Sequence, residues 1–142
     1  MINTDLTRKA MTIAYNAHIN QLDKAGMPYI YHPIHLAEQM NTETECVVAL
    51  LHDVVEDTDI TFEELEKEFP KEIMEPLKLL THDKNVEYMK YIKKLSDDPI
   101  AKKIKIADIM HNSDETRLSK ITEKDIARRK KYKEALEYLT NQ

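Results

Sequence analysis

The feature that most constrains this fold is the near absence of glycine, because Gly26 is the only glycine among 142 residues. Tight β-hairpin turns depend on residues that adopt positive φ, above all glycine, so this chain has little means of building a sheet from hairpins. No segment shows the strict alternation of apolar and polar side chains that is typical of a half-buried strand. The sequence therefore predicts an all-α fold.

Apolar spacing and terminus signals predict a bundle of about 7–9 helices. Thr61-Phe62-Glu63-Glu64 and Thr122-x-x-Asp125 are helix-start patterns, and Asp98-Pro99 opens another helix. Gly26 and Pro28 interrupt the first helical pattern. The expected helices are residues 4–22, 32–40, 45–57, 62–68, 71–80, 85–96, 99–113 and 122–139.

Length, charge and cysteine content limit the class of protein. The chain suits one domain, residues 1–142, and it contains neither a membrane-spanning apolar stretch nor a secretory signal. The single Cys46 cannot form an internal disulfide, which is typical of the reducing cytoplasm. A net charge of −5 argues against a nucleic-acid partner, although it allows a small anionic substrate. The oligomeric state stays open.

The most informative segment begins with six consecutive apolar residues, 46–51, which cover every face of a helix and predict a buried position. His52, Asp53, Glu56 and Asp57 follow immediately. Carboxylates near the negative end of a helix repel one another and the helix dipole, so a nearby cation is expected to compensate them. A buried metal ion would do so. The alternative is a capped helix end whose acidic side chains point into water.

Further metal ligands would have to come from elsewhere in the chain. His32 precedes a proline at a predicted helix start, and Asp108 lies among apolar residues of a later helix. Taken alone, the former is typical of a surface histidine and the latter of a salt-bridge partner.

Four segments in order, however, match a known pattern: Ala17-His18-x-x-Gln21, Lys24-Ala25-Gly26-x-Pro28-Tyr29-Ile30-x-His32-Pro33, Ala49-Leu50-Leu51-His52-Asp53-Val54-Val55-Glu56-Asp57-Thr58, and Lys105-Ile106-Ala107-Asp108-x-x-His111-Asn112. From about residue 5 to 118, the chain resembles the HD-domain metal-dependent phosphohydrolases. Within them it is most similar to the hydrolase domain of RelA/SpoT-type alarmone enzymes.

The resemblance implies a site. His32, His52, Asp53 and Asp108 would bind one divalent metal ion, and such a mixed set of nitrogen and oxygen ligands suits Mn²⁺ or a similar ion. The acidic pair Glu56 and Asp57 would be catalytic, orienting or deprotonating the attacking water or protonating the leaving oxygen. Lys24 and Asn112 would contact the substrate.

The reaction of that family is removal of the 3′-pyrophosphate from guanosine tetra- or pentaphosphate, which yields GDP or GTP and pyrophosphate. Three positions that are usually basic in the alarmone hydrolases hold Asp23, Ile109 and Asp114 in this chain. Two alternatives therefore stay open. The first is an HD phosphohydrolase that acts on another nucleotide or a phosphomonoester. The second is a non-enzymatic helical module that keeps a metal ion and binds a ligand.

Overall fold

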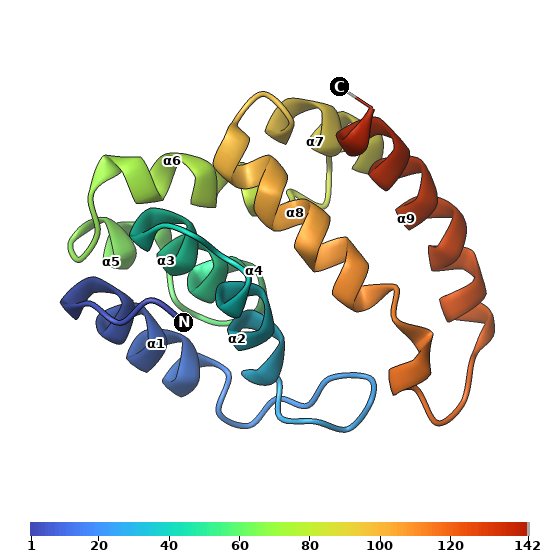
Figure 1. Ribbon diagram of the computed structural model, residues 1–142, viewed down its shortest axis with the longest axis horizontal. Coiled ribbons are helices and arrows are strands. Elements are labelled where there is room, and N and C mark those ends of the chain that lie inside the picture. Colours follow the sequence, from blue (N-terminus) through green and yellow to red (C-terminus); the bar gives the residue numbers. More distant parts are fainter. Residues whose placement is uncertain (142) are drawn as a thin grey trace.

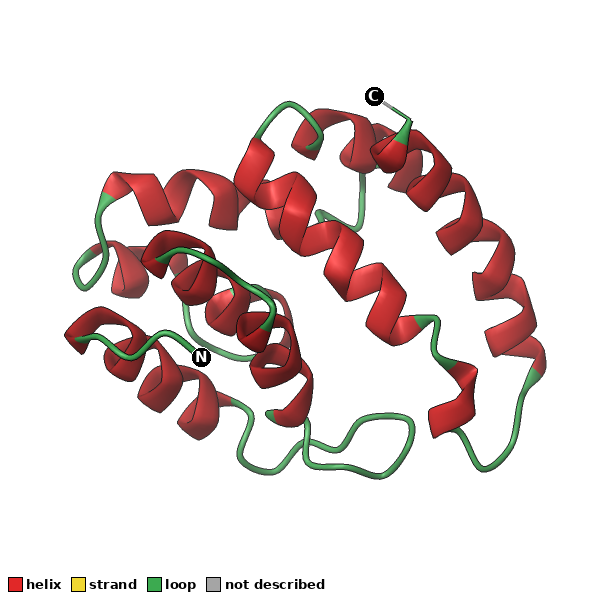
Figure 2. Ribbon diagram, viewed as in Figure 1, coloured by secondary structure: helices red, strands yellow, loops and turns green. Residues whose placement is uncertain are grey.

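The computed structural model describes residues 1–141, and within this range it contains nine α-helices, one short 3₁₀ helix and no strand (Figures 1 and 2). The only β-type pairing in that range is an isolated bridge between Leu22 and Pro28. The prediction of an all-α fold is confirmed. The elements are α1 (Asp5–Ala17), α2 (Tyr31–Glu38), α3 (Glu43–Leu51), α4 (Val54–Asp57), α5 (Phe62–Glu66), α6 (Lys71–Leu80), α7 (Tyr88–Leu95), α8 (Pro99–Asn112), η1 (Glu115–Arg117) and α9 (Glu123–Thr140).

Side-chain caps set most of the helix starts. The predicted caps are confirmed at Thr61 and Thr122, whose hydroxyl oxygens accept hydrogen bonds from backbone N–H groups three residues on, and at Asp98. Thr4 and Thr42 cap α1 and α3 in the same way. Because each cap satisfies amides that the helix itself leaves unpaired, these boundaries are encoded locally.

Two predicted helices differ most from the observed ones. The first helix ends at Ala17 rather than at residue 22. The predicted helix 45–57 is two helices, since the chain breaks at His52 and Asp53, where Asp53 has φ −107° and ψ 1°. The His52 ring Nδ1 donates to the carbonyl oxygen of Ala49 at 2.7 Å, which occupies an acceptor in the last turn of α3. The break places the acidic pair Glu56 and Asp57 on the separate short helix α4.

The apolar helix α3 lies at the centre of the fold, as its sequence predicts. All six of its residues from Cys46 to Leu51 are fully buried, and α1, α2, α6 and α8 pack around it. The helices α8 and α9 lie side by side and run in opposite directions, with α9 also packed on α7 (Figure 1). No helix within residues 1–141 is long and apolar enough to cross a membrane.

We expect Leu50→Ala to lower the free energy of unfolding by about 2–5 kcal/mol, because the truncation leaves a cavity in a packed core. Leu50 has no exposed surface. Urea denaturation followed by circular dichroism measures the change. Leu22→Ala is the matched control, because Leu22 is 67% exposed, and a loss as large as that of Leu50→Ala would contradict the central role of α3.

Candidate metal centre

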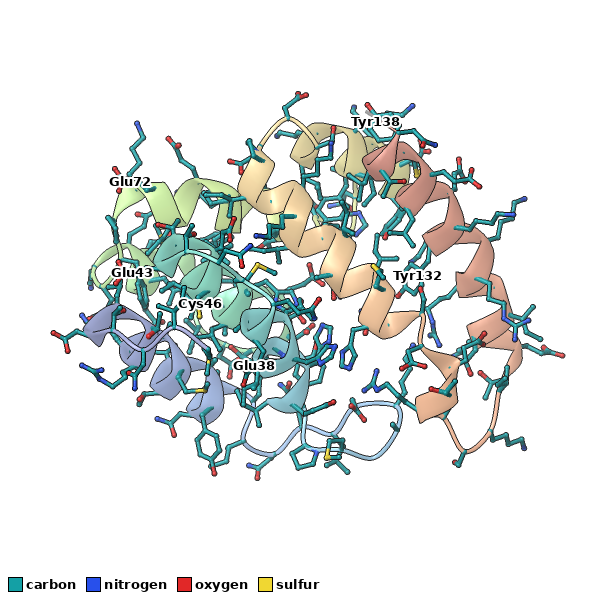
Figure 3. The ribbon with its side chains drawn as sticks, viewed as in Figure 1. Glu38, Glu43, Cys46, Glu72, Tyr132 and Tyr138 are labelled. Atoms are coloured by element: carbon teal, nitrogen blue, oxygen red, sulfur yellow. The ribbon has the colours of Figure 1, made fainter. Side chains whose placement is uncertain are left out.

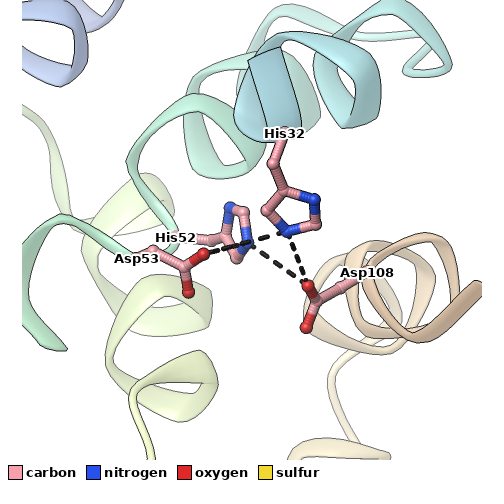
Figure 4. A group of neighbouring side chains, drawn as sticks. All are labelled: His32, His52, Asp53 and Asp108. Carbon is pink, nitrogen blue, oxygen red and sulfur yellow. Dashed lines mark hydrogen bonds and ion pairs between the residues drawn. The ribbon is translucent and has the colours of Figure 1, made fainter. Parts of the chain in front are cut away.

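Four side chains from three separate elements converge at one buried point (Figure 4). His32 comes from the start of α2, His52 and Asp53 from the break after α3, and Asp108 from α8. Each residue offers one ligand atom, and these atoms all lie within 4.8 Å of one another. His32 Nε2 is 2.8 Å from Asp108 Oδ1, and His52 Nε2 is 2.9 Å from Asp53 Oδ2. The structure thus brings together all four predicted ligands.

The chemistry of this cluster fits a divalent metal ion. The bond from His52 Nδ1 to a backbone carbonyl, which can only accept, fixes the proton of neutral His52 on Nδ1. The lone pair of His52 Nε2 therefore faces the cluster, 2.9 Å from Asp53 Oδ2 and 3.6 Å from Asp108 Oδ1, and within residues 1–141 no contact of this buried atom has regular hydrogen-bond geometry. A nitrogen lone pair directed between two carboxylates is the arrangement that a cation would complete.

Charge holds both carboxylates ionised. Burial alone raises the pKa of Asp108, but Lys105 and the two histidines hold that pKa well below its usual range. Burial likewise opposes ionisation of Asp53, but the positive charge of protonated His52 lowers the pKa of Asp53, and a bound cation would take over that role. Ionised carboxylates are the form that binds a metal ion.

Three residues around the ligands were not predicted in these roles. The ammonium group of Lys105 lies 2.9 Å from Asp108 Oδ2, so one oxygen of Asp108 is paired and the other faces the cluster. The Asn112 side-chain amide donates to Asp108 Oδ1 at 3.0 Å, and the Tyr29 hydroxyl donates to Asp53 Oδ2. Their motif positions were visible in the sequence, but these contacts depend on packing. Such outer partners orient the ligands.

The acidic pair lies one turn beyond the ligands, at the edge of the site. Glu56 Oε1 accepts a hydrogen bond of 2.8 Å from the backbone N–H of His82. Gln21 donates to the carbonyl oxygen of Asp57, and Gln21 is itself held by His18. Partial desolvation, followed by the charges of Asp53 and Glu56, raises the pKa of Asp57 to about 6. Glu56 is thus anchored through its side chain and Asp57 through its backbone carbonyl, in both cases by residues outside α4.

Two adjoining pockets extend from the cluster, with volumes of about 290 and 220 Å³. Tyr29, Asn112 and Tyr132 line both pockets, so the two adjoin along these side chains, and we call them together the groove. Tyr132 lies between α8 and α9 (Figure 3). The smaller pocket contains the acidic pair together with Lys105 and Lys131, and we call it the acidic-pair end. The larger pocket, lined by residues 22–25 and Arg117, is called the loop end.

The loop end contains Lys24, one of the two predicted substrate contacts, and Asn112 is the other. Gly26 adopts φ 83°, so the loop uses the only glycine for its turn. Asp23 Oδ1 accepts from the backbone N–H groups of Ala25 and Met27, and Asp23 Oδ2 pairs with Arg117 at 2.6 Å. Asp23 therefore shapes the loop and offsets the charge of Arg117.

Other residues behave differently from the sequence interpretation. Ile109 is only 1% exposed and belongs to the core, so it is not placed for substrate contact. Asp114, by contrast, does line the loop end, and its side chain also caps η1 by accepting from the backbone N–H of Thr116. The basic run 128–131 of α9 is only in part a solvated helix face, because Arg128 lines the loop end and Lys131 the acidic-pair end. Its periodicity gives no such signal, since only the packing of α9 turns these side chains inward.

Comparison with known proteins agrees with this architecture. Residues 10–108 match the HD domain family. The zebrafish (Danio rerio) guanosine-3′,5′-bis(diphosphate) 3′-pyrophosphohydrolase MESH1 is 34% identical over 125 residues, which cover 78% of this chain and 68% of that protein. The bifunctional (p)ppGpp synthase/hydrolase SpoT of Escherichia coli is 35% identical over 120 residues.

The relatives differ greatly in length. The match covers 74% of this chain but 17% of SpoT, and for the probable GTP pyrophosphokinase of Mycobacterium leprae, which is 35% identical, it covers 78% of this chain and 16% of that protein. A solved structure described as a metazoan ortholog of SpoT that hydrolyzes ppGpp superimposes with a TM-score of 0.78 over 98% of this chain and 87% of that one. The two sequences are 24% identical, and the superposition shows that the two chains share a fold. The family match over residues 10–108 and the extent of the match to MESH1 together show that this chain belongs to the HD-domain family.

Proposed function

We propose that this protein is a metal-dependent phosphohydrolase that removes the 3′-pyrophosphate of guanosine tetra- or pentaphosphate, yielding GDP or GTP and pyrophosphate. The observation that carries the proposal is the four-ligand cluster, whose ligand atoms lie within 4.8 Å of one another beside the acidic pair. The similarity to MESH1, a guanosine-3′,5′-bis(diphosphate) 3′-pyrophosphohydrolase, and to SpoT, a (p)ppGpp synthase/hydrolase, supports this choice of substrate. We further propose that residues 1–142 act as one such domain, in the cytoplasm.

The metal ligands in this proposal are His32, His52, Asp53 and Asp108. Two imidazoles and two carboxylates favour an ion that accepts both nitrogen and oxygen, and we propose Mn²⁺. When bound, such an ion would lower the pKa of a coordinated water and offset negative charge on a phosphate.

The remaining chemistry belongs to the side chains of the groove. Glu56 and Asp57 orient the attacking water and accept its proton, or return a proton to the leaving oxygen. The anchoring of Glu56 by the N–H of His82 leaves its other oxygen available for that role. Lys24 and Asn112 contact the nucleotide, with Lys24 meeting phosphate charge at the loop end.

A product assay tests the proposal directly. The protein is stripped of metal, loaded with Mn²⁺ and incubated with guanosine tetraphosphate, NADPH and nucleoside monophosphates, and pyrophosphate is distinguished from orthophosphate. We expect GDP and pyrophosphate in equal amounts from the tetraphosphate. Orthophosphate from a different nucleotide would replace the proposal by another HD phosphohydrolase activity. Mn²⁺ binding without turnover of any substrate would favour a binding module.

The pairing of Asp23 with Arg117 leads to a prediction for substrate affinity. We expect Asp23→Asn to lower the KM for guanosine tetraphosphate about three- to tenfold, because the amide oxygen still caps the loop while the guanidinium gains freedom to meet phosphate. A gain of about 1 kcal/mol corresponds to such a factor. Steady-state kinetics on the Mn²⁺-loaded protein measure it.

The matched control for this prediction is Asp97→Asn, which changes the net charge equally at an exposed position outside the groove. An equal fall in KM for the control would assign the effect to overall charge. A rise in KM for Asp23→Asn would show that the Asp23–Arg117 pair itself supports binding.

A further inference from the structure

Two histidines that are far apart in the sequence meet edge to edge behind the metal cluster. His32 Nδ1, on α2, lies 2.6 Å from His111 Nδ1, on α8. The ring planes differ by only 6° while the ring centroids are 4.9 Å apart, so the nearest atoms are the two nitrogens and the rings share nearly one plane. This is the geometry of an in-plane N–H···N hydrogen bond, in which one nitrogen donates and the other accepts.

The two histidine ligands of the cluster are therefore held in different ways. The Nδ1 of His52 donates to the backbone carbonyl of Ala49, an acceptor that allows only one tautomer. The Nδ1 of His32 faces another imidazole, which can either donate or accept. The position of the proton on His32 consequently depends on its partner rather than on the backbone.

Proton counting assigns the roles in the occupied site. His32 Nε2 points towards the carboxylates, at 2.8 Å from Asp108 Oδ1 and 3.8 Å from Asp53 Oδ2. A nitrogen that binds a metal ion carries no proton, so the proton of neutral His32 must be on Nδ1. The acceptor for that proton is His111 Nδ1, at 2.6 Å.

We propose that His111 is a positioning residue of the metal centre, which accepts the Nδ1 proton of His32 and thereby keeps the Nε2 lone pair of His32 available for the metal ion. The inference rests on the metal site of the proposed function. The surroundings hold the His111 ring in place: His35 packs against it with centroids 4.1 Å apart, and Arg117 donates to its backbone carbonyl at 3.1 Å. His111 is only 5% exposed, so water competes poorly for its Nδ1.

Affinity for Mn²⁺ alone, measured by isothermal titration calorimetry on the full chain, tests this role without reference to hydrolysis. His111→Leu removes the acceptor at similar volume, and we expect Mn²⁺ to bind about 10- to 100-fold more weakly. His111→Asn places an amide oxygen close to the position of Nδ1 and should restore most of that affinity. The matched control is His35→Leu. It replaces a half-buried ring that packs against His111 but leaves the contact between His32 Nδ1 and His111 Nδ1 in place.

Nitrogen-15 NMR of the histidine rings gives a second readout, with diamagnetic Zn²⁺ or Mg²⁺ in place of Mn²⁺. We expect the loaded wild-type protein to show His32 protonated at Nδ1. The inference is overturned if His32 is protonated at Nε2 in the loaded protein, if His111→Leu binds Mn²⁺ as tightly as wild type, or if His111→Asn binds as weakly as His111→Leu. Failure of the wild-type protein to bind any of these ions would overturn the proposed function as well.

Discussion

His52→Ala is expected to abolish metal binding and turnover together. His52 supplies a nitrogen that faces the cluster, within 4.8 Å of the other three ligand atoms. Without it the site keeps one imidazole and two crowded carboxylates, so the ion binds more weakly. The variant thereby loses the several kcal/mol of transition-state stabilisation that a bound metal ion supplies. We expect hydrolysis of guanosine tetraphosphate to fall by about a thousandfold or more. Metal analysis after gel filtration and single-turnover assays measure the two losses.

A control is needed because His52 is buried and its truncation also removes packing. Leu51→Ala removes a neighbouring side chain that is equally buried but offers no ligand atom. We expect this variant to be less stable to urea while retaining its metal ion in the folded state. Full activity in a metal-free His52→Ala protein would contradict the mechanism, and loss of metal from folded Leu51→Ala would assign the effect to packing.

The double substitution Glu56→Ala with Asp57→Ala is expected to leave the metal content unchanged and to lower kcat about 10²- to 10⁴-fold, the usual contribution of general acid–base catalysis. Neither residue contributes an atom to the four-ligand cluster, although both line the acidic-pair end of the groove. The separation of metal content from kcat is what distinguishes this change from His52→Ala.

The matched control removes two carboxylates from an exposed surface. Glu72→Ala with Glu75→Ala does so on α6, outside both pockets. We expect this control to retain wild-type kcat. Unchanged kcat in the Glu56/Asp57 double variant would rule out the acidic pair as the source of proton transfer, and loss of its metal ion would show that the pair serves binding instead.

The sequence alone determined the fold class and the helix starts that are capped by Thr61, Asp98 and Thr122. One glycine in the whole chain disfavours hairpins, and the hydroxyls of Thr61 and Thr122 act on amides only three residues away, so these features are local. The burial of residues 46–51 followed from their apolar character on every face. The four ligands were found because their motifs stand in a recognisable order, not because spacing alone could bring residues 32 and 108 together.

Tertiary structure decided how those pieces act on one another. The break at His52–Asp53 separates α3 from α4, although the apolar and acidic pattern reads as one helix. The bonds from His32 to His111 and from Arg117 to Asp23 join residues 79 and 94 positions apart. Periodicity reports which face of a helix is apolar, but not which neighbour that face meets. The partners of the ligands and the charge of the groove therefore depend on packing, because such contacts form only when distant helices are brought together in the folded core.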